Sequence, residues 1–423
     1  MDIFPYPMHV RTMPNGLKVV LVPFDSPGII AYYSIVRAGS RNEVEAGHSG
    51  FAHFFEHMMF RGTEKYSTDE YNLLFKVLGS DANAYTSDDL TCYHSLFGKD
   101  GLEKVVEAEA DRFRNLKYSV SDFQQESRAV LGEYNKNYSR PISKIYERLR
   151  DTAFTKHTYK HTTMGFLKDI EDMPNQFDYS LKFFDRYYRP NNVVLLVVGD
   201  IDPDYTYGLI EKYYGGWEAR EYNPEIPVEP KQTEHKKAHI DWENETLPYI
   251  AVAYHTPQFD PSTKDNAGLD ILARLLFGST SDLHRELVIE EQSVEFLSTY
   301  VPDRRDPGLF LIYCRVKEEE NVEKVKSRIY ETLAAAQSTA VDEKRLADIK
   351  SRLRYSFAMG LDTAEGVADE LTHFINLTGD PFAVNEIYKR YEEISSKDII
   401  TLARRYFTKD NCTEVTLTGA KGQ

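Results

Sequence analysis

The chain has 423 residues and a formal net charge of -16 at pH 7. Its length exceeds the size at which one hydrophobic core stops growing, so we expect two domains of about 200 residues each. The acidic charge argues against sequence-independent nucleic-acid binding, which needs clustered Lys and Arg to displace counterions from phosphates. Basic or neutral partners fit this charge better.

The cysteines and the N-terminal stretch limit the cellular compartments that fit this chain. Cys92, Cys314 and Cys412 are widely spaced and odd in number, which indicates small buried residues rather than a disulfide framework. The opening "MDIFPYPMHVRTMPNGLKVVLV" lacks the pattern of a secretory signal, and no apolar run of about 18 residues occurs. We therefore predict a soluble protein without a membrane span. It would be cytoplasmic from the absence of a signal sequence, and periplasmic if the numbered chain is a processed form.

The first half of the chain mixes strand and helix patterns. Asn15-Gly16 lies before the apolar runs 17–24 and 28–40, which predict antiparallel strands. The run 191–201 predicts a strand that closes this half. Helical spacing of apolar residues predicts further helices at three places: about 68–78, 101–115 and 121–138.

The strand and helix patterns recur after a polar passage. Pro224, Pro227 and Pro230 make this passage stiff, and we expect a linker at 221–240. Beyond it, the spacing predicts in turn a strand, a helix and a long amphipathic helix: 247–256, 266–278 and about 341–359.

The ends of the two halves resemble each other. "DRYYRPNNVVLLVVGD" from Asp185 matches "RRYFTKDNCTEVTLTGA" from Arg404 as an aromatic pair, a turn, a strand and a glycine. A repeat of this length predicts a duplicated domain rather than a solenoid. The fold class that we expect is α+β, with two similar domains at 1–220 and 241–423, each an antiparallel-rich sheet packed with helices.

The stretch "GHSGFAHFFEHMMFRGTEKY" holds three ionisable residues, His53, Glu56 and His57, in an otherwise apolar run. Such groups are costly in apolar surroundings unless something pairs with them. On a helix, His53 and His57 project from the same side one turn apart, which suits two nitrogen ligands of one metal ion. Glu56 lies on the neighbouring side, within reach of a metal-bound water. A catalytic zinc ion needs a third protein ligand from elsewhere.

The candidate for this third ligand is Glu133, on the predicted helix 121–138. Glu126 lies seven residues earlier on nearly the same stripe. Seven residues rise about 10.5 Å, too far for both carboxylates to reach one ion. One of them is therefore a ligand, and the other is at most a supporting or substrate-facing group. A chance occurrence of the motif is the alternative, and the apolar surroundings and the carboxylate-rich helix favour the metal site.

The motif at 53–57, followed by Glu133, resembles the inverted zinc motif of the pitrilysin and insulinase family, which includes mitochondrial processing peptidase. Members of this family pair two similar α+β domains, in agreement with the internal repeat. Five further stretches carry the same resemblance: "NGLKVVLV", "AGSRNE", "FRGT", "NAYTSDDLTCYH" and "YYRPNNVVLLVVGD".

The resemblance implies that His53, His57 and Glu133 bind one zinc ion per chain. It also implies that Glu56 is the general base and that Glu126 is a supporting catalytic carboxylate. Two neutral imidazoles and one carboxylate leave a residual positive charge on the metal, which lowers the pKa of a bound water from about 15.7 toward about 7. Glu56 can then accept a proton during attack on a peptide carbonyl. The expected activity is that of a zinc metalloendopeptidase, a hydrolase of extended or unfolded peptides.

The segment "NAYTSDDLTCYH" predicts an edge strand near the site, and a plain core strand is its structural alternative. In the family the matching segment pairs with an extended substrate backbone, so the resemblance implies that Asn83 and Ala84 bind substrate by strand addition. His157 and His161 have ligand-like spacing, but their surroundings indicate a loop, and we expect structural roles for them and for His94.

Catalytically complete members of the family carry an Arg and a Tyr seven residues apart in the second domain. A gapless comparison from Ser281 and Leu283 places Val288 and Glu295 at those positions. Valine cannot donate a hydrogen bond to a developing oxyanion, and a glutamate repels it. Arg285 and Tyr300 lie nearby and could substitute in a different geometry.

This departure predicts a division of labour between two subunits, and three alternatives follow. The first is a heterodimer with a homologous subunit that lacks zinc ligands but supplies the Arg and Tyr pair. The second is a self-sufficient homodimeric peptidase, and the third is a non-catalytic peptide-binding or scaffold subunit. The intact set of four site residues in the first domain counts against the scaffold.

Overall fold

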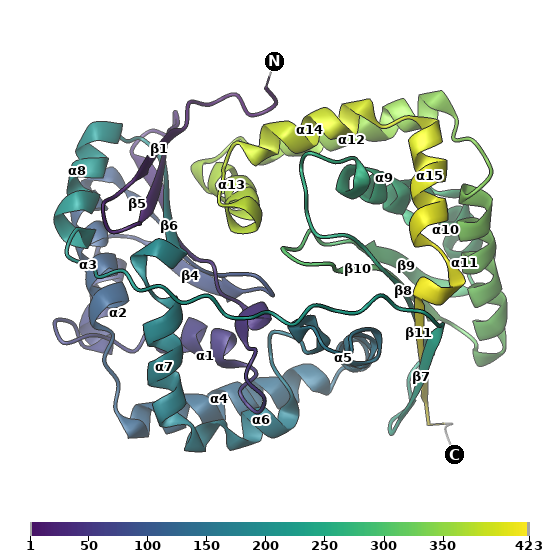
Figure 1. Ribbon diagram of the computed structural model, residues 1–423, viewed down its shortest axis with the longest axis horizontal. Coiled ribbons are helices and arrows are strands. Elements are labelled where there is room, and N and C mark those ends of the chain that lie inside the picture. The colour runs from purple at the N-terminus through teal and green to yellow at the C-terminus, as the bar shows by residue number, and fades with distance from the viewer. Residues whose placement is uncertain (1, 421–423) are drawn as a thin grey trace. The chain divides into compact units, whose positions relative to one another are not determined.

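The computed structural model describes residues 2–420 and contains two sheets, each packed with helices (Figure 1). The chain divides into two compact units that are interleaved in sequence. The first unit comprises residues up to Tyr134, His161–Pro227 and Phe357–Ala383. The second comprises Asn135–Lys160, Val228–Ser356 and residues from Val384 onward.

The first unit contains a six-stranded sheet in the order β1-β2-β6-β3-β5-β4. Its strands are β1 His9–Thr12, β2 Lys18–Pro23, β3 Ile29–Val36, β4 Asp81–Thr86, β5 Thr91–Gly98 and β6 Val193–Gly199. Strands β2 and β3 run antiparallel as predicted, but they do not pair, because β6 lies between them. Every residue of β6 is buried, and a strand that is apolar on both faces gains most from a central position.

Helices of the first unit surround this sheet. They are α1 Phe51–Met58, α2 Thr68–Val77, α3 Leu102–Asn115, α6 Leu167–Asp172, α7 Phe177–Tyr187, α8 Pro203–Tyr214 and α13 Ala364–Thr378. Helix α4, Val120–Tyr138, begins in this unit and continues past its boundary. The predicted helices at 68–78, 101–115 and 121–138 thus correspond closely to α2, α3 and α4. Helix α2 begins with a capping box, in which Ser67 and Glu70 satisfy each other's backbone amides.

The second unit contains a five-stranded sheet in the order β7-β11-β8-β10-β9. Its strands are β7 Lys236–Trp242, β8 Tyr249–His255, β9 Val294–Tyr300, β10 Leu309–Val316 and β11 Cys412–Gly419. Its helices are α5 Pro141–Ala153, α9 Asp265–Phe277, α10 Asp282–His284, α11 Val322–Ala336, α14 Ala383–Glu393, which starts at the unit boundary, and α15 Ser396–Tyr406. Helix α12, Glu343–Gly360, begins in this unit and continues past its boundary. Shorter 3-10 turns join several of these elements, and Arg285–Glu290 forms a π-helix.

The two sheets have the same topology, which confirms the predicted α+β fold with a duplicated unit. The order β2-β6-β3-β5-β4 in one sheet corresponds to β7-β11-β8-β10-β9 in the other. In both sheets the first pair of this series is parallel and the remaining pairs are antiparallel. Strand β9 is therefore the counterpart of β4, and both lie at a sheet edge.

Each unit receives one helix from the opposite half of the chain. Helix α5 belongs to the first half but packs against β7, β8 and β11, and Figure 1 shows it in blue beside these green and yellow strands. Helix α13 belongs to the second half but packs against β3 and β6, where the Tyr33 hydroxyl donates to Asp369 (2.8 Å). The predicted ranges 1–220, 221–240 and 241–423 divide the chain linearly and do not include this exchange. As boundaries of the sequence duplication they stay a prediction.

A candidate metal centre

Helix α1 starts at a buried turn that an acidic side chain holds. Gly50 has φ +92°, and the carboxylate of Glu43 accepts hydrogen bonds from the amides of Gly50 (2.8 Å) and Ala52 (2.7 Å). Burial raises the pKa of Glu43 to about 8, although these two amides favour the ionised form. Glu43 thus fixes the first turn of the helix that carries the HFFEH motif.

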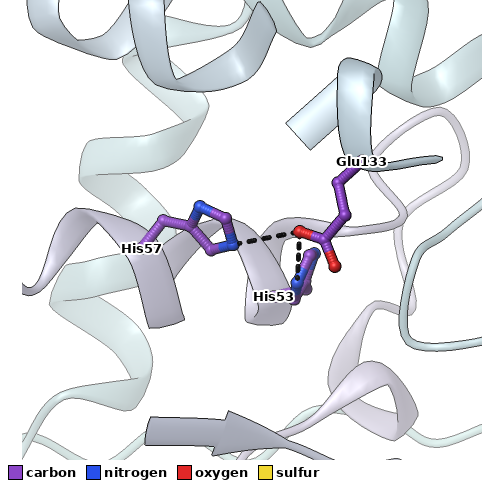
Figure 2. A group of neighbouring side chains, drawn as sticks. All are labelled: His53, His57 and Glu133. Carbon is purple, nitrogen blue, oxygen red and sulfur yellow. Dashed lines mark ion pairs between the residues drawn. The ribbon is translucent and has the colours of Figure 1, made fainter. Parts of the chain in front are cut away.

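Three residues of the first unit converge in the way a metal site requires. One ligand atom of each of His53, His57 and Glu133 lies within 4.8 Å of the others, and no other such group occurs among residues 2–420. Glu133 Oε2 lies 3.5 Å from His53 Nε2 and 3.4 Å from His57 Nε2. Figure 2 shows both imidazoles on α1 directed toward the carboxylate that descends from α4. Two imidazole nitrogens and one carboxylate oxygen are a donor set typical of catalytic zinc.

Glu126 contacts the site from behind His57. Its Oε1 accepts a hydrogen bond from His57 Nδ1 (2.8 Å), and its Oε2 accepts from Arg61 Nε (2.8 Å). Burial opposes ionisation of Glu126, but these bonds outweigh it and hold the pKa of the carboxyl below its usual value. The bond from Nδ1 leaves His57 Nε2 facing Glu133, so Glu126 orients a ligand rather than serving as one.

The pKa values of the two histidines shift in opposite directions. The hydrogen bond to Glu126 raises the pKa of His57, whereas burial lowers the pKa of His53. Atom Nδ1 of His53 is buried and has no hydrogen-bond partner among the described residues. A neutral His53 places its lone pair on Nε2 when the proton sits on Nδ1, and this tautomer suits metal binding.

Glu56 lies on the neighbouring side of α1 and is held by the adjacent strand. Its Oε2 accepts a hydrogen bond from the hydroxyl of Thr86 at the end of β4 (2.6 Å). An open cleft of about 320 Å³ adjoins it. The cleft is lined by Glu56, His57, Phe60, Arg61, Thr68, Asn72, Asn83, Ala84 and Glu126. The structure therefore brings the predicted substrate residues Asn83 and Ala84 to the same cleft as the predicted base.

The cleft also contains residues that sequence reasoning missed. Phe60 and Arg61 lie just beyond α1, which ends at Met58, so helical spacing from His57 did not indicate their place in the cleft. Thr68 and Asn72 are one turn apart on α2, which was predicted as a helix without a role. Glu43 ends the stretch "AGSRNE", and nothing in that stretch indicates its contact with α1.

Strand β4 offers a free edge to an extended chain. Within residues 2–420 it pairs only with β5, and the segment 81–94 continues through a turn at 87–90 into β5, which lies inside the sheet. Ser87 donates its amide to Leu90 across the hairpin, and hydrogen bonding alternates along an antiparallel strand. The main-chain groups of Ala82, Ala84 and Thr86 therefore face away from β5.

The remaining histidines have local partners. His157 Nε2 lies 3.1 Å from Asp306 Oδ2, and the ring accepts the amide of Tyr159 (3.0 Å). His161 Nδ1 donates to the carbonyl of Thr162 (2.9 Å), and His94 stacks on Tyr33. These contacts agree with the structural roles expected from the sequence.

The positions of the expected Arg and Tyr pair lie in the second unit. Val288 belongs to the π-helix, and Glu295 is an exposed residue of β9 that forms an ion pair with Arg315 (2.8 Å). Arg285 is exposed and lies near Asp282 (3.3 Å) and Glu290 (3.5 Å). Arg285 is the first residue of this π-helix, whose side chains do not follow α-helical spacing. The gapless comparison therefore does not predict which way Arg285 faces.

Comparison with known proteins identifies relatives of the chain. Two family models match the chain: "Insulinase (Peptidase family M16)" over residues 31–166 and "Peptidase M16 inactive domain" over residues 177–353. Zinc protease PqqE of Helicobacter pylori is 28% identical, with 96% of this chain and 91% of the relative covered. The beta subunit of the mitochondrial-processing peptidase of Saccharomyces cerevisiae is 24% identical, with 92% and 87% covered.

Solved structures show the same fold. The crystal structure of a protease from Helicobacter pylori has a TM-score of 0.92 and 27% identity, and the match covers 98% of this chain and 100% of that chain. The periplasmic protease PqqL from Escherichia coli has a TM-score of 0.79 and 18% identity, covering 98% of this chain and 48% of that chain. No helix within residues 2–420 has the length and apolar character that crossing a membrane requires. The chain belongs to the insulinase family, peptidase family M16.

Proposed function

We propose that this chain is the zinc-bearing subunit of an endopeptidase that hydrolyses extended or unfolded peptides. The observation that carries the proposal is the convergence of His53, His57 and Glu133 within 4.8 Å, with Glu56 beside them at an open cleft. The three donors fit one zinc ion and leave a fourth position for water or substrate. Names of relatives such as zinc protease PqqE support the choice of metal.

The bound metal would activate a water molecule and polarise the peptide carbonyl. Glu56 accepts the proton of the attacking water and returns it to the leaving amine. The hydroxyl of Thr86 holds one carboxylate oxygen of Glu56, so the base keeps one orientation toward the cleft. Arg61 and Glu126 fix His57 from behind, which limits rotation of that ligand.

Strand β4 would present the substrate. An extended peptide that pairs with the outward main-chain groups of Ala82, Ala84 and Thr86 continues the sheet past the cleft. This binding mode selects peptides by their extended conformation more than by their sequence, because main-chain hydrogen bonds supply the contacts. Ala84 is thereby assigned to main-chain pairing with the substrate, whereas Asn83, whose main chain faces β5, is assigned to the lining of the cleft.

We assign a heterodimer as the active form. Val288 and Glu295 cannot stabilise an oxyanion, and Arg285 lies near two carboxylates. A homologous partner without zinc ligands would supply the missing donors. The relatives named as beta subunits of the mitochondrial-processing peptidase support a subunit role. A self-sufficient homodimer is the second candidate, and Tyr300, 45% exposed on β9, favours it as an alternative donor.

Metal analysis combined with peptide cleavage tests the proposal. The purified chain should hold one zinc ion, and the Glu133→Gln variant should lose both the metal and any cleavage in the presence of the partner. Glu211→Gln, an exposed residue on α8, is the matched control and should keep both. Retention of stoichiometric zinc and activity by Glu133→Gln would refute the site.

A further inference from the structure

The cleft beside Glu56 has one wall that the proposed catalytic steps leave unused. Helix α2 contributes Thr68 and Asn72 to this wall, and Phe60 contributes an aromatic ring. Thr68 and Asn72 are four residues apart and so project from the same side of the helix. A general base lies within hydrogen-bond reach of the water that attacks the scissile carbonyl. A substrate side chain next to the scissile bond therefore has room to enter the space between Glu56 and this wall.

Asn72 brings a side-chain amide without a partner to the cleft. The side chain is exposed and forms no hydrogen bond with any other residue within 2–420. An asparagine carries one acceptor oxygen and two N–H donors, so it can both donate to and accept from a single amide group. The hydroxyl of Thr68, in contrast, already donates to the carbonyl of Arg61. Asn72 is thus the residue of this wall whose hydrogen bonds a substrate can complete.

Phe60 gives the wall a restrained apolar surface. The guanidinium of Arg112, a residue that is 3% exposed, lies 5.1 Å from the centre of the Phe60 ring. The ring of Tyr93 lies 6.2 Å from the same centre. Both contacts are attractive and restrain the aromatic ring. A planar amide can pack on such a ring while its polar edge reaches a hydrogen-bonding partner.

The charges of the cleft count against an ionised substrate side chain. Arg61 and His57 both bond to Glu126, so neither is available to pair with an acidic side chain. The carboxylate of Glu56 would also repel such a group. A basic side chain would be attracted to Glu56 and would compete with the water whose proton this base accepts. The lining therefore favours a side chain that is uncharged and forms hydrogen bonds.

We propose that Asn72 is a specificity-determining residue, which selects peptides with an amide side chain, glutamine or asparagine, next to the scissile bond. The amide packs on Phe60 and exchanges hydrogen bonds with the side chain of Asn72. Because the cleft is open, water competes for these bonds and the selection is moderate. The inference rests on the proposed function, since it assigns the substrate class of the same site.

Peptide cleavage by the chain with its homologous partner tests this role. A cleaved peptide is varied at each of the two positions that flank the scissile bond, with Gln or with Met, which has a similar length. At one position, kcat/KM should be about 2- to 10-fold higher for Gln, the range that one net hydrogen bond supplies. Asn72→Leu should remove this ratio, and it should fold, because leucine has the higher helix propensity and the position is exposed. Equal kcat/KM values at both positions with the unaltered chain would overturn the proposal.

Asn72→Asp provides a second readout, because it adds a charge with almost no change in volume. It should raise kcat/KM for a Lys peptide relative to the Gln peptide by about 2- to 5-fold, as expected for an exposed ion pair. Lys76→Gln, an exposed residue of α2 outside the cleft, is the matched control and should keep the Gln preference. Wild-type selectivity in both Asn72 variants would overturn the proposal. Zinc content and thermal unfolding identify any variant that has lost the site or the fold.

Failure of this inference is distinguishable from failure of the proposed function. Zinc-dependent cleavage without a Gln preference refutes the role of Asn72 alone. If the mixture cleaves nothing, the peptidase is refuted, and fluorescence anisotropy with labelled ten-residue peptides still tests Asn72 in the Glu56→Gln variant. The Gln peptide should bind about 2- to 10-fold more tightly than the Met peptide, and adding Asn72→Leu should abolish the difference. Equal affinities of the two peptides for the Glu56→Gln variant would overturn the role of Asn72.

Discussion

Ionisable side chains are held among the phenylalanines of α1 by partners from other elements. Glu56 is bonded by Thr86, His57 by Glu126, and the two histidines face Glu133. Each partner offsets the cost of placing a polar group in apolar surroundings. The site is thus a set of paired groups, and removal of one partner leaves another group exposed to an unfavourable environment.

Glu56→Gln should slow cleavage strongly while keeping the metal. A glutamine cannot accept the proton of the attacking water, and loss of a general base typically lowers the rate by about 10²–10⁴-fold. The kcat of the chain with its partner and the zinc content measured together check this expectation. A variant that cleaves at the wild-type rate would remove Glu56 from the mechanism, whatever its zinc content.

Glu126→Gln should weaken zinc binding without eliminating it. The amide no longer attracts the proton of His57 Nδ1 as a carboxylate does, and changes of this kind cost about 10- to 100-fold in metal affinity. Competition with a chromogenic chelator measures the effect, with Glu211→Gln as the control. Unchanged affinity would show that Glu126 has no part in orienting His57.

Glu43 should make stability depend on pH in an unusual direction. Its pKa of about 8 in the folded chain exceeds that of an exposed glutamate, so the folded state binds the extra proton. Its stabilising contribution is full below about pH 4.5 and is lost as the pH rises through 8. Asp169 and Asp88 add to the raised pKa, and His161 Nδ1 lies 3.7 Å from the carboxylate.

The comparison with Glu43→Gln isolates this effect. Between pH 5 and 8, the free energy of unfolding of the wild type should fall relative to that of the variant, whose side chain does not titrate. Urea unfolding at several pH values measures the difference. A wild type that gains stability over the variant as the pH rises would mean that Glu43 is an ordinary ionised cap.

For single residues of the site, the sequence indicated which side chains take part but not which distant residues they contact. His53, Glu56 and His57 share one short helix, so spacing alone brought them together. Arg61 and Glu126 are 65 residues apart, and Glu43 meets α1 through a turn at Gly50. Such contacts depend on how distant elements pack, which periodicity does not encode.

Among the elements, β4 carries the clearest expectation for substrate binding. Ala84→Pro removes an outward amide without breaking the pairing with β5, because proline is tolerated at a sheet edge. Loss of one main-chain hydrogen bond should lower kcat/KM about 2- to 10-fold, with zinc content unchanged. Peptides methylated at alternate amides provide the complementary test, since only one register should lose activity. Equal effects in both registers would contradict strand addition at β4.

Helices were easier to predict than strand neighbours. Helix α4 was expected at 121–138 and occupies Val120–Tyr138, because the apolar spacing that predicts it is local. The runs that became β2 and β3 gave no sign that β6, distant in sequence, would separate them. The sequence likewise gave no sign of the π-helix at Arg285–Glu290, which departs from regular α-helical spacing.

Across the whole chain, the duplicated topology could be expected from the matching ends of the two halves, whereas the exchange of α5 and α13 could not. Each of these helices has an apolar face that fits either sheet by pattern alone, and only the packing of the folded chain decides between them. The sequence therefore predicted the number and class of units but not their interleaved composition.

Activity should require a second subunit. The isolated chain should bind zinc yet cleave peptides about 10²–10³-fold more slowly than the mixture with its homologous partner, because the oxyanion donors at 288 and 295 are missing. Initial rates with the chain alone, the partner alone and the mixture measure this. Full activity of the purified chain by itself would favour the homodimer.

The central claim is that one zinc ion is held by His53, His57 and Glu133. An anomalous difference map collected at the zinc absorption edge, on crystals of the zinc-loaded chain, tests it most directly. The account predicts a single strong peak bonded to Nε2 of both histidines and to the carboxylate of Glu133. A peak at any other position, or none among these three side chains, would contradict it.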